Sequence, residues 1–127
     1  MFGQKKSKRL LTVGLLEGNR PVVAQTLKNG QKVTIGPHKK NTFVIHSAKL
    51  PKKFTLLQPK GDRYLLTFLP EMQGKIAVKG SALPLTTLIQ RGVVETKKGQ
   101  HTVSISNRTR GKIVFENCRL LFRFDDA

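Results

Sequence analysis

The stretch "VTIGPHKKNTFVIHSAKLPKKFTLL", residues 33–57, divides into two halves, 33–45 and 46–57, that are built alike. Each half contains strand-like apolar residues interrupted by a short basic loop. The apolar runs are rich in Val, Ile, Thr and Phe, which favour strands, whereas Gly36, Pro37 and Pro51 interrupt them. The pattern predicts short strands connected by two lysine-rich loops.

The same rhythm continues along the whole chain. Turn residues recur every 8–12 residues or so, a spacing that is typical of an all-β sandwich or barrel. We expect a sandwich of about eleven short strands. Their ranges are 9–16, 22–27, 31–35, 42–46, 53–58, 63–69, 74–79, 93–96, 101–106, 111–116 and 118–124.

Alternation and turn signals refine this prediction. In "CRLLFRF", residues 118–124, Leu120, Phe122 and Phe124 share one face and Arg119, Leu121 and Arg123 the other, which indicates a strand with one wet side. A tight turn is expected at Glu116–Asn117. Residues 85–91 depart from the strand pattern: Leu85, Leu88 and Ile89 have helical spacing and Gly92 follows, so we expect a short helical turn there, capped by a threonine.

Length and composition bound the organisation. A chain of 127 residues fits one domain, expected over 9–124, with flexible ends at 1–8 and 125–127. The single cysteine, Cys118, excludes an internal disulfide and suits a reducing cytoplasm. No stretch approaches the roughly 20 apolar residues that a membrane-spanning helix needs.

The charge is strongly unbalanced, with 24 Lys and Arg against 7 Asp and Glu and a formal net charge of +17. Such a chain attracts anionic partners: nucleic acid, anionic membrane surfaces, and acidic or phosphorylated protein segments. No acidic residue occurs between Gly18 and Gly61, whereas nine basic residues do. Lys39, Lys40, Lys52 and Lys53 could therefore form one anion-docking patch from two loops, or could simply be solvated lysines.

The motifs around these loops resemble the forkhead-associated (FHA) domain, over about residues 10–124. This family is an eleven-strand β-sandwich that binds phosphothreonine peptides through loops at one end. Gly36 occupies the position of the family's loop glycine, and Asn41 that of a small polar residue. Gln73 and Gly74 occupy the positions of an Asn-Gly pair, and "RGKIVFENCRLLFRF", residues 110–124, resembles the closing hairpin.

This sequence departs from the family at the positions that matter for phosphate. Pro37 stands where the resemblance implies a phosphate-binding arginine, Pro51 stands for the phosphate-binding serine, and Phe54 replaces a structural histidine. Proline has neither charge nor N–H to donate. Each lost charge-assisted hydrogen bond is worth roughly 1.5–3 kcal/mol, so we expect phosphothreonine binding to be lost.

A narrower resemblance comes from "KLPKKFTL", residues 49–56, and "LPEMQGKIAV", residues 69–78. Both are similar to degenerate FHA-like domains at the cytoplasmic N-terminus of bacterial gliding-motility and TonB-like envelope proteins. The resemblance implies a cytoplasmic scaffold head, tethered to the inner membrane within a longer parent protein.

Other functions find less support. His38, His46 and His101 are unrelated in spacing, and no cluster of Cys, His and carboxylates predicts a metal site or an enzyme. Tyr64 is the only tyrosine and there is no tryptophan, which disfavours a single-stranded nucleic-acid reader that stacks bases on aromatic rings.

We therefore expect a non-catalytic, phosphopeptide-independent protein-docking module that needs no cofactor. The candidate contact residues are Gly36, Pro37, His38, Lys39, Lys40, Asn41, Pro51, Lys52, Lys53, Gln73 and Gly74. Two alternatives stay open. Phosphothreonine binding could survive through Lys52 and Lys53, or charge alone could attach the chain to nucleic acid or an anionic membrane.

Overall fold

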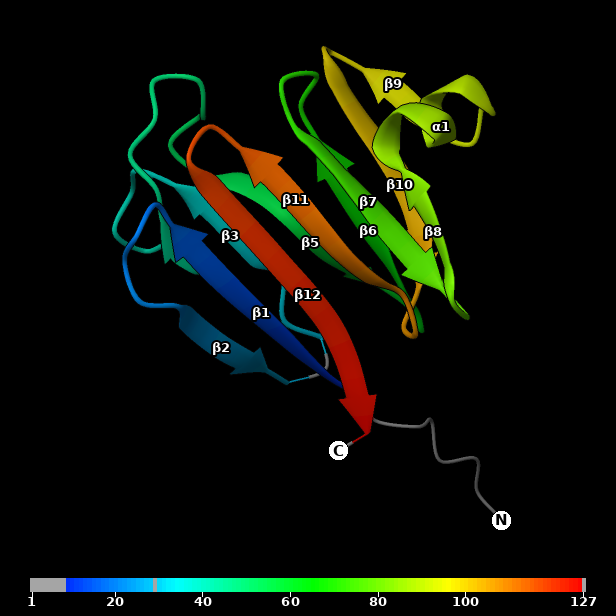
Figure 1. Cartoon of the computed structure of the whole chain (residues 1–127), viewed down its shortest axis with the longest axis horizontal. Helices are drawn as coiled ribbons and strands as arrows, with labels where there is room; N and C mark the ends of the chain where they lie inside the picture. The colour runs from blue at the N-terminus through cyan, green and yellow to red at the C-terminus, as the bar shows by residue number, and fades with distance from the viewer. Residues whose placement is uncertain (1–8, 29, 127) are drawn as a thin grey trace.

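The computed structural model describes residues 9–28 and 30–126, which form two stacked six-stranded sheets and a short helix (Figure 1). The first sheet has the strand order β2 (Val23–Leu27), β1 (Arg9–Glu17), β12 (Cys118–Asp126), β11 (Arg110–Phe115), β7 (Gln73–Val78), β8 (Ser81–Pro84). The second has the order β4 (Phe43–Val44), β3 (Val33–Gly36), β5 (Phe54–Lys60), β6 (Arg63–Phe68), β10 (Gln100–Ser106), β9 (Glu95–Lys97). The predicted all-β sandwich is confirmed.

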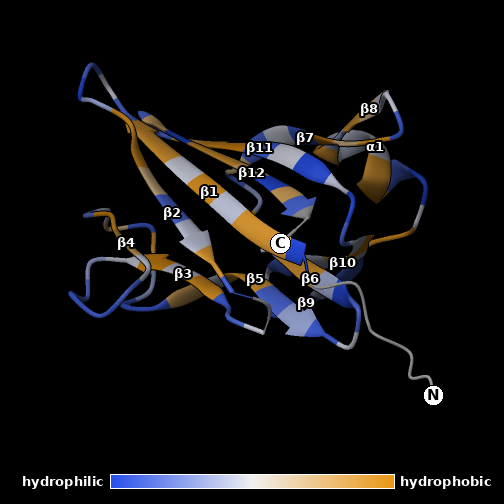
Figure 2. Ribbon diagram, turned by 90° about the horizontal axis from the view of Figure 1, so that it is seen from below, coloured by the Kyte–Doolittle hydropathy of each residue, from blue (hydrophilic) through white to orange (hydrophobic). Residues whose placement is uncertain are grey.

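The hydrophobic core lies between the two layers, which Figure 2 shows edge-on. In β12 the predicted alternation is confirmed, because Leu120, Phe122 and Phe124 are buried whereas Arg119, Leu121 and Arg123 are exposed. Burying one such aliphatic or aromatic side chain stabilises the fold by about 1.5–3 kcal/mol. The fully buried side chains come from both sheets and include Val13, Ile35, Leu56, Leu66, Phe68, Ile113 and Phe115.

The described residues contain twelve strands, and β8 is the one that the sequence did not predict. It is only four residues long and ends at Pro84, so its sequence carries little strand signal. Its turn signal is clearer, because Lys79 and Gly80 both have positive φ, 52° and 83°, and form a two-residue hairpin turn between β7 and β8. The predicted turn at Glu116–Asn117 is confirmed, with Phe115 paired to Cys118.

All the predicted strands differ from the structure by one or two residues at one or both ends, and three of the differences matter here. β4 covers only Phe43–Val44 rather than 42–46, which leaves His46 outside the strand. β9 begins at Glu95 rather than at residue 93. β12 extends to Asp126, beyond the expected end at 124, because Asp126 pairs with Arg9 at the start of β1. The expectation of a flexible end at 125–127 is wrong for Asp125 and Asp126, which belong to β12, whereas residues 1–8 and 127 lie outside the described residues.

The expected short helix is present as α1 (Leu85–Gln90), which packs against β7 and β8. Leu85 and Leu88 are buried as their spacing predicts, but Ile89 is 41 % exposed. The N-cap is Pro84 rather than a threonine, and Gly92 follows with a φ of 72°. No helix within the described residues is long and apolar enough to cross a bilayer.

Cys118 is buried at the start of β12, and this makes its reactivity a test of the fold. Burial, and to a smaller extent the carboxylates of Glu17 and Glu116, raise the pKa of its thiol. Only the thiolate reacts readily, so we expect the native protein to resist a thiol reagent at neutral pH and the unfolded chain to react fast. Similar labelling rates with and without guanidinium would contradict this burial.

The raised pKa of the Cys118 thiol also predicts the direction in which the free energy of unfolding changes with pH. Because the unfolded thiol loses its proton first, near its ordinary pKa of about 8.5, the unfolded chain binds fewer protons than the native one above that pH. The free energy of unfolding should therefore fall as pH rises above about 8.5, and a Cys118→Ala variant should fall less. Burial likewise raises the pKa of the Tyr64 hydroxyl. The free energy of unfolding of the Cys118→Ala variant should therefore still fall near pH 10, where an unfolded tyrosine loses its proton.

Candidate functional site

Two loops at one end of the second sheet form the candidate site, at the upper left of Figure 1. Residues 37–42 connect β3 to β4, and residues 45–53 connect β4 to β5. β3 and β4 are parallel, with Ile35 opposite Phe43, so the first loop must reverse the chain direction and return within six residues. We call these two segments the paired loops.

The side-chain amide of Asn41 joins the paired loops. Its Nδ2 donates to the carbonyl oxygen of His38 in the same loop at 2.9 Å and to that of Lys52 in the other loop at 2.8 Å. The backbone N–H of His38 donates to the same Lys52 oxygen at 3.3 Å. Asn41 is only 8 % exposed, and its Oδ1 is buried with no hydrogen-bond partner among the described residues. The amide is therefore held by its two donor hydrogens.

Gly36 allows the loops to meet at close range. A Cβ at this position would lie 2.5 Å from the Lys52 carbonyl oxygen and 2.8 Å from that of Pro51, and the φ of 148° also disfavours a side chain. The Gly36 carbonyl accepts a hydrogen bond from the N–H of Ile45 at 2.8 Å. The glycine singled out by the FHA resemblance thus has a backbone packing role that only glycine fills.

Two threonines that the sequence analysis missed brace the first loop. The N–H of Thr34 donates to Thr42 Oγ1 at 3.0 Å, and the N–H of Thr42 donates to Thr34 Oγ1 at 3.1 Å. Gln25 of β2 adds a bond from the other sheet, Nε2 to the Thr42 carbonyl oxygen at 2.6 Å. The only sequence signal was a threonine on each side of the loop, which is too common to predict a reciprocal bond.

The upper surface of the paired loops is basic. His38, Lys39, Lys40, Lys49, Lys52 and Lys53 are all exposed. The ion pairs of Arg20 with Glu17 and of Arg123 with Asp125 lie elsewhere in the fold. Because residues 18–61 contain no acid, the positive potential of these lysines is not offset by their own segment. The sequence-predicted lysines are exposed on both loops, and their joint anion-docking patch stays a prediction.

A shallow hollow of about 380 Å³ continues from this surface. It begins at Pro51 and Lys53 and runs over the outer face of β5, β6 and β10. Its floor is mostly polar and includes Thr67 and Thr102, whose hydroxyl oxygens are 3.2 Å apart. A partner segment that meets the lysines would therefore find further contact area on the same sheet.

Gln73 and Gly74 begin β7, which belongs to the first sheet. The connection between β6 and β7 lies at the same upper end in Figure 1. Both residues, however, pair with β11, opposite Val114 and Ile113. Gly74 serves packing there, since a Cβ would lie 2.0 Å from the Lys112 carbonyl oxygen. A contribution of Gln73 to docking stays a prediction.

The three positions that depart from the FHA pattern have clear environments. Pro37 is half-buried and Pro51 is exposed. Because both are prolines, neither position offers a charge or a hydrogen-bond donor. Phe54 is buried in the core at the start of β5. Its ring fills space at a position where a polar side chain would need a partner.

Other chemistry is not concentrated anywhere in the described part of the chain. His46 is exposed outside a strand, and His101 lies in β10 with its Nδ1 2.8 Å from Thr96 Oγ1. Within residues 9–28 and 30–126, no group of three or more Cys, His, Asp or Glu side chains could hold a metal ion.

Comparison with known proteins adds no family: no family model, no curated protein and no solved structure matches this chain.

Proposed function

We propose that this chain is a non-catalytic docking module, a degenerate FHA-like domain that holds a protein partner on its paired loops. One observation carries the proposal. Asn41 bonds the two loops to each other, and the only charged side chains in residues 37–42 and 45–53 are basic. A partner with an acidic segment has the matching chemistry.

The geometry of the loops suits docking because little has to be ordered when a partner binds. Gly36, Asn41 and the Thr34–Thr42 pair fix the backbone in the free protein. Ordering a loop on binding reduces affinity, so a preorganised surface keeps more of its contact energy. The lysines would mainly steer the encounter, while buried contacts around Pro51 and the neighbouring hollow would supply affinity.

The proposed docking does not depend on phosphothreonine. At positions 37 and 51 proline replaces the two side chains through which the resemblance implies phosphate binding. Losing two or three charge-assisted bonds of roughly 1.5–3 kcal/mol each would weaken binding by several factors of ten. Lys52 and Lys53 remain able to attract a phosphate as point charges but lack the fork geometry of arginine.

The proposed setting is the cytoplasmic head of a bacterial envelope or motility machine. Its support is the likeness of residues 49–56 and 69–78 to such heads. In the fold, the first of these segments lies mostly in the second of the paired loops and the second leads into β7. In this setting the module would act as a scaffold that recruits a cytoplasmic partner.

An NMR titration tests the docking and its phosphate independence together. The probes are a phosphothreonine peptide library, its unphosphorylated copy and an acidic peptide library, in about 150 mM salt. We expect amide shifts near Gly36, Lys52 and Lys53 with acidic peptides and no preference for phosphate. Shifts that require phosphate would instead favour the alternative in which lysines retain phosphothreonine binding.

Charge reversal separates a specific surface from net charge. The double variant Lys52→Glu/Lys53→Glu should weaken binding of the acidic peptides at least roughly tenfold, which is about 1.4 kcal/mol. Lys97→Glu/Lys98→Glu makes the same charge change at two exposed lysines in and after β9 and should stay within about twofold. Equal losses in both variants would show that net charge alone binds, as a nucleic-acid or membrane surface would require.

A further inference from the structure

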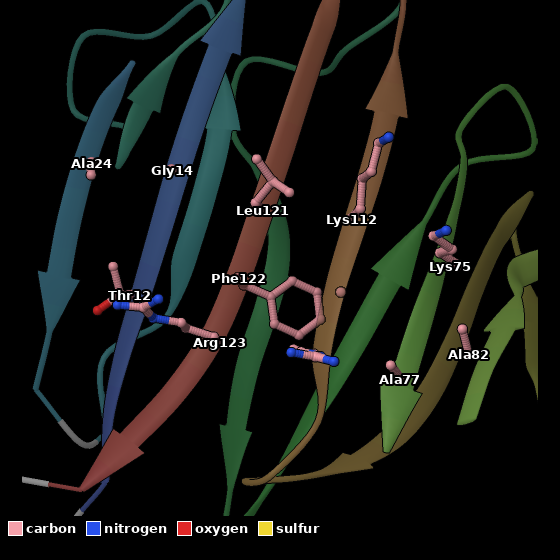
Figure 3. A pocket seen from close by; sticks show the side chains of 12 residues that line it. Thr12, Gly14, Ala24, Lys75, Ala77, Ala82, Lys112, Leu121, Phe122 and Arg123 are labelled. Carbon is pink, nitrogen blue, oxygen red and sulfur yellow. The ribbon is translucent and has the colours of Figure 1, made fainter. Parts of the chain in front are cut away.

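The outer face of the first sheet carries a larger hollow, which we call the outer groove (Figure 3). Its volume is about 640 Å³, and its lining residues come from β1, β2, β7, β8, β11 and β12. It therefore lies on the other layer of the sandwich from the paired loops, which connect strands of the second sheet. The proposed docking function does not use it.

Small side chains make this sheet face hollow. Across three neighbouring strands the register aligns Ala24 of β2 with Gly14 of β1 and then with Leu121 of β12. On the other side of the groove Ala77 of β7 stands opposite Ala82 of β8. Leu121 is 42 % exposed and stands between Gly14 of β1 and Lys112 of β11, so an apolar side chain lies open beside a glycine. Such a surface gains free energy when a partner covers it.

Cations lie between two groups of small apolar residues, because the central strands β12 and β11 separate Ala24 and Gly14 from Ala77 and Ala82. Lys112 of β11 stands directly opposite Lys75 of β7, and Arg110 stands opposite Ala77 one row further along. Arg123 of β12 also lines the groove, where its Nε donates to Asp125 Oδ2 at 3.0 Å. The lining residues include no Asp or Glu. Like charges directly opposite on neighbouring strands destabilise a sheet, so the Lys75–Lys112 pair is unfavourable until an anion lies between the two.

We propose that the outer groove docks an acidic amphipathic helix of a partner protein. The apolar residues of the groove match an apolar stripe, and the positive charges of Lys75, Lys112 and Arg110 beside them match neighbouring carboxylates. Small residues let a helix approach the sheet closely, and Gly14 of β1 and Ala77 of β7 supply them on either side of the two central strands.

A helix fits better than an extended peptide because of its backbone. On the face of a sheet, the strand N–H and C=O groups lie in the plane of the sheet and bond to neighbouring strands. An extended segment on that face would find no backbone partners, whereas a helix satisfies its own. A second copy of this chain is a poor occupant, because each copy carries a net charge of +17.

The probe is a designed helical peptide of about five turns made of Leu, Ala and Glu, with the leucines in one stripe. Its control is a permuted peptide of the same composition with the leucines scattered. Titration of the full chain, followed by amide NMR, should shift the signals of Gly14, Ala77, Gly111 and Leu121 with the first peptide. The permuted peptide should leave them nearly unchanged.

Substitutions then localise the binding. Leu121→Asp should weaken the affinity at least roughly tenfold, because it removes the exposed apolar contact and repels the carboxylates. Val93→Asp, at a residue that is 55 % exposed outside the groove, makes the same change and should stay within about twofold. Lys52→Glu/Lys53→Glu should not alter the pattern of shifts in the groove, which distinguishes this site from the paired loops.

Four results would overturn the proposal. They are equal binding of the permuted peptide, shifts confined to the paired loops, no binding at millimolar peptide, and equal affinities of the Leu121→Asp and Val93→Asp variants. Vesicles of phosphatidylcholine and phosphatidylserine form a last arm. If they perturb the groove signals and the helical peptide does not, the face binds anionic lipid instead.

Discussion

The Gly74→Ala variant is expected to lose about 4 kcal/mol of its free energy of unfolding, a large part of the stability of a domain of this size. Gly74 pairs with Ile113 between β7 and β11 at a φ of 149°, a region that side chains strongly disfavour. A Cβ there would also lie 2.0 Å from the Lys112 carbonyl oxygen, so the two strands would have to separate. Backbone strain and overpacking each cost about 1–3 kcal/mol.

Gly61→Ala is the matched control for this prediction. Gly61 has a φ of 63°, but nothing lies within 4 Å of the position where its Cβ would stand. We expect a loss of about 1 kcal/mol there, from backbone conformation alone. Urea denaturation followed by circular dichroism measures both variants. Equal losses would mean that the close approach of β7 to Lys112 is not as the structure has it.

The Asn41→Asp variant should lose about 3 kcal/mol at neutral pH and should loosen the paired loops. The substitution replaces two donor hydrogens with a carboxylate oxygen that faces the carbonyl oxygens of His38 and Lys52. An uncompensated buried charge and two lost hydrogen bonds act in the same direction. Hydrogen exchange at the His38 amide, which bonds to the same Lys52 oxygen, should become faster.

The loss in Asn41→Asp should depend on pH. Burial raises the pKa of the new carboxyl above its ordinary value of about 4, so the folded state retains its proton to a higher pH than the unfolded chain does. The deficit relative to the parent protein should therefore be smaller at about pH 4 than at pH 7, because a protonated carboxyl can donate to one carbonyl. Asn19→Asp, at an exposed residue, should change stability by less than about 0.5 kcal/mol at either pH. A pH-independent deficit would argue against the buried amide bonds.

Strand alternation predicted the architecture well because one face of each sheet is dry. In β12 every second residue is buried, and this regular period carried the prediction. β8 was missed because its four residues pair only with β7 at the sheet edge and have no buried face to reveal them. Ile89 was placed on the wrong face because a helix of six residues is too short for a reliable period.

The candidate site was predicted in part. Gly36 and Asn41 followed from the FHA resemblance, but the contacts that explain them, to Pro51 and Lys52, depend on how two loops meet in space. The outer groove could not be predicted, because its pairing of Lys75 with Lys112 is set by the register of β7 against β11. In the sequence those lysines belong to two separate alternating strands, where each looks like an ordinary residue on the solvent-exposed side.

The pairing of β1 with β12 in the first sheet joins the first described strand of the chain to the last. During synthesis, residues 9–17 leave the ribosome well before residues 118–126, so the edge of β1 that binds β12 stays unpaired until β12 emerges. Because such long-range pairing is slow, the apolar face of Leu11, Val13 and Leu15 would stay open while the strands between β1 and β12 are synthesised. The time before the last strand emerges is thus the period in which this small domain is most exposed to aggregation and to chaperones.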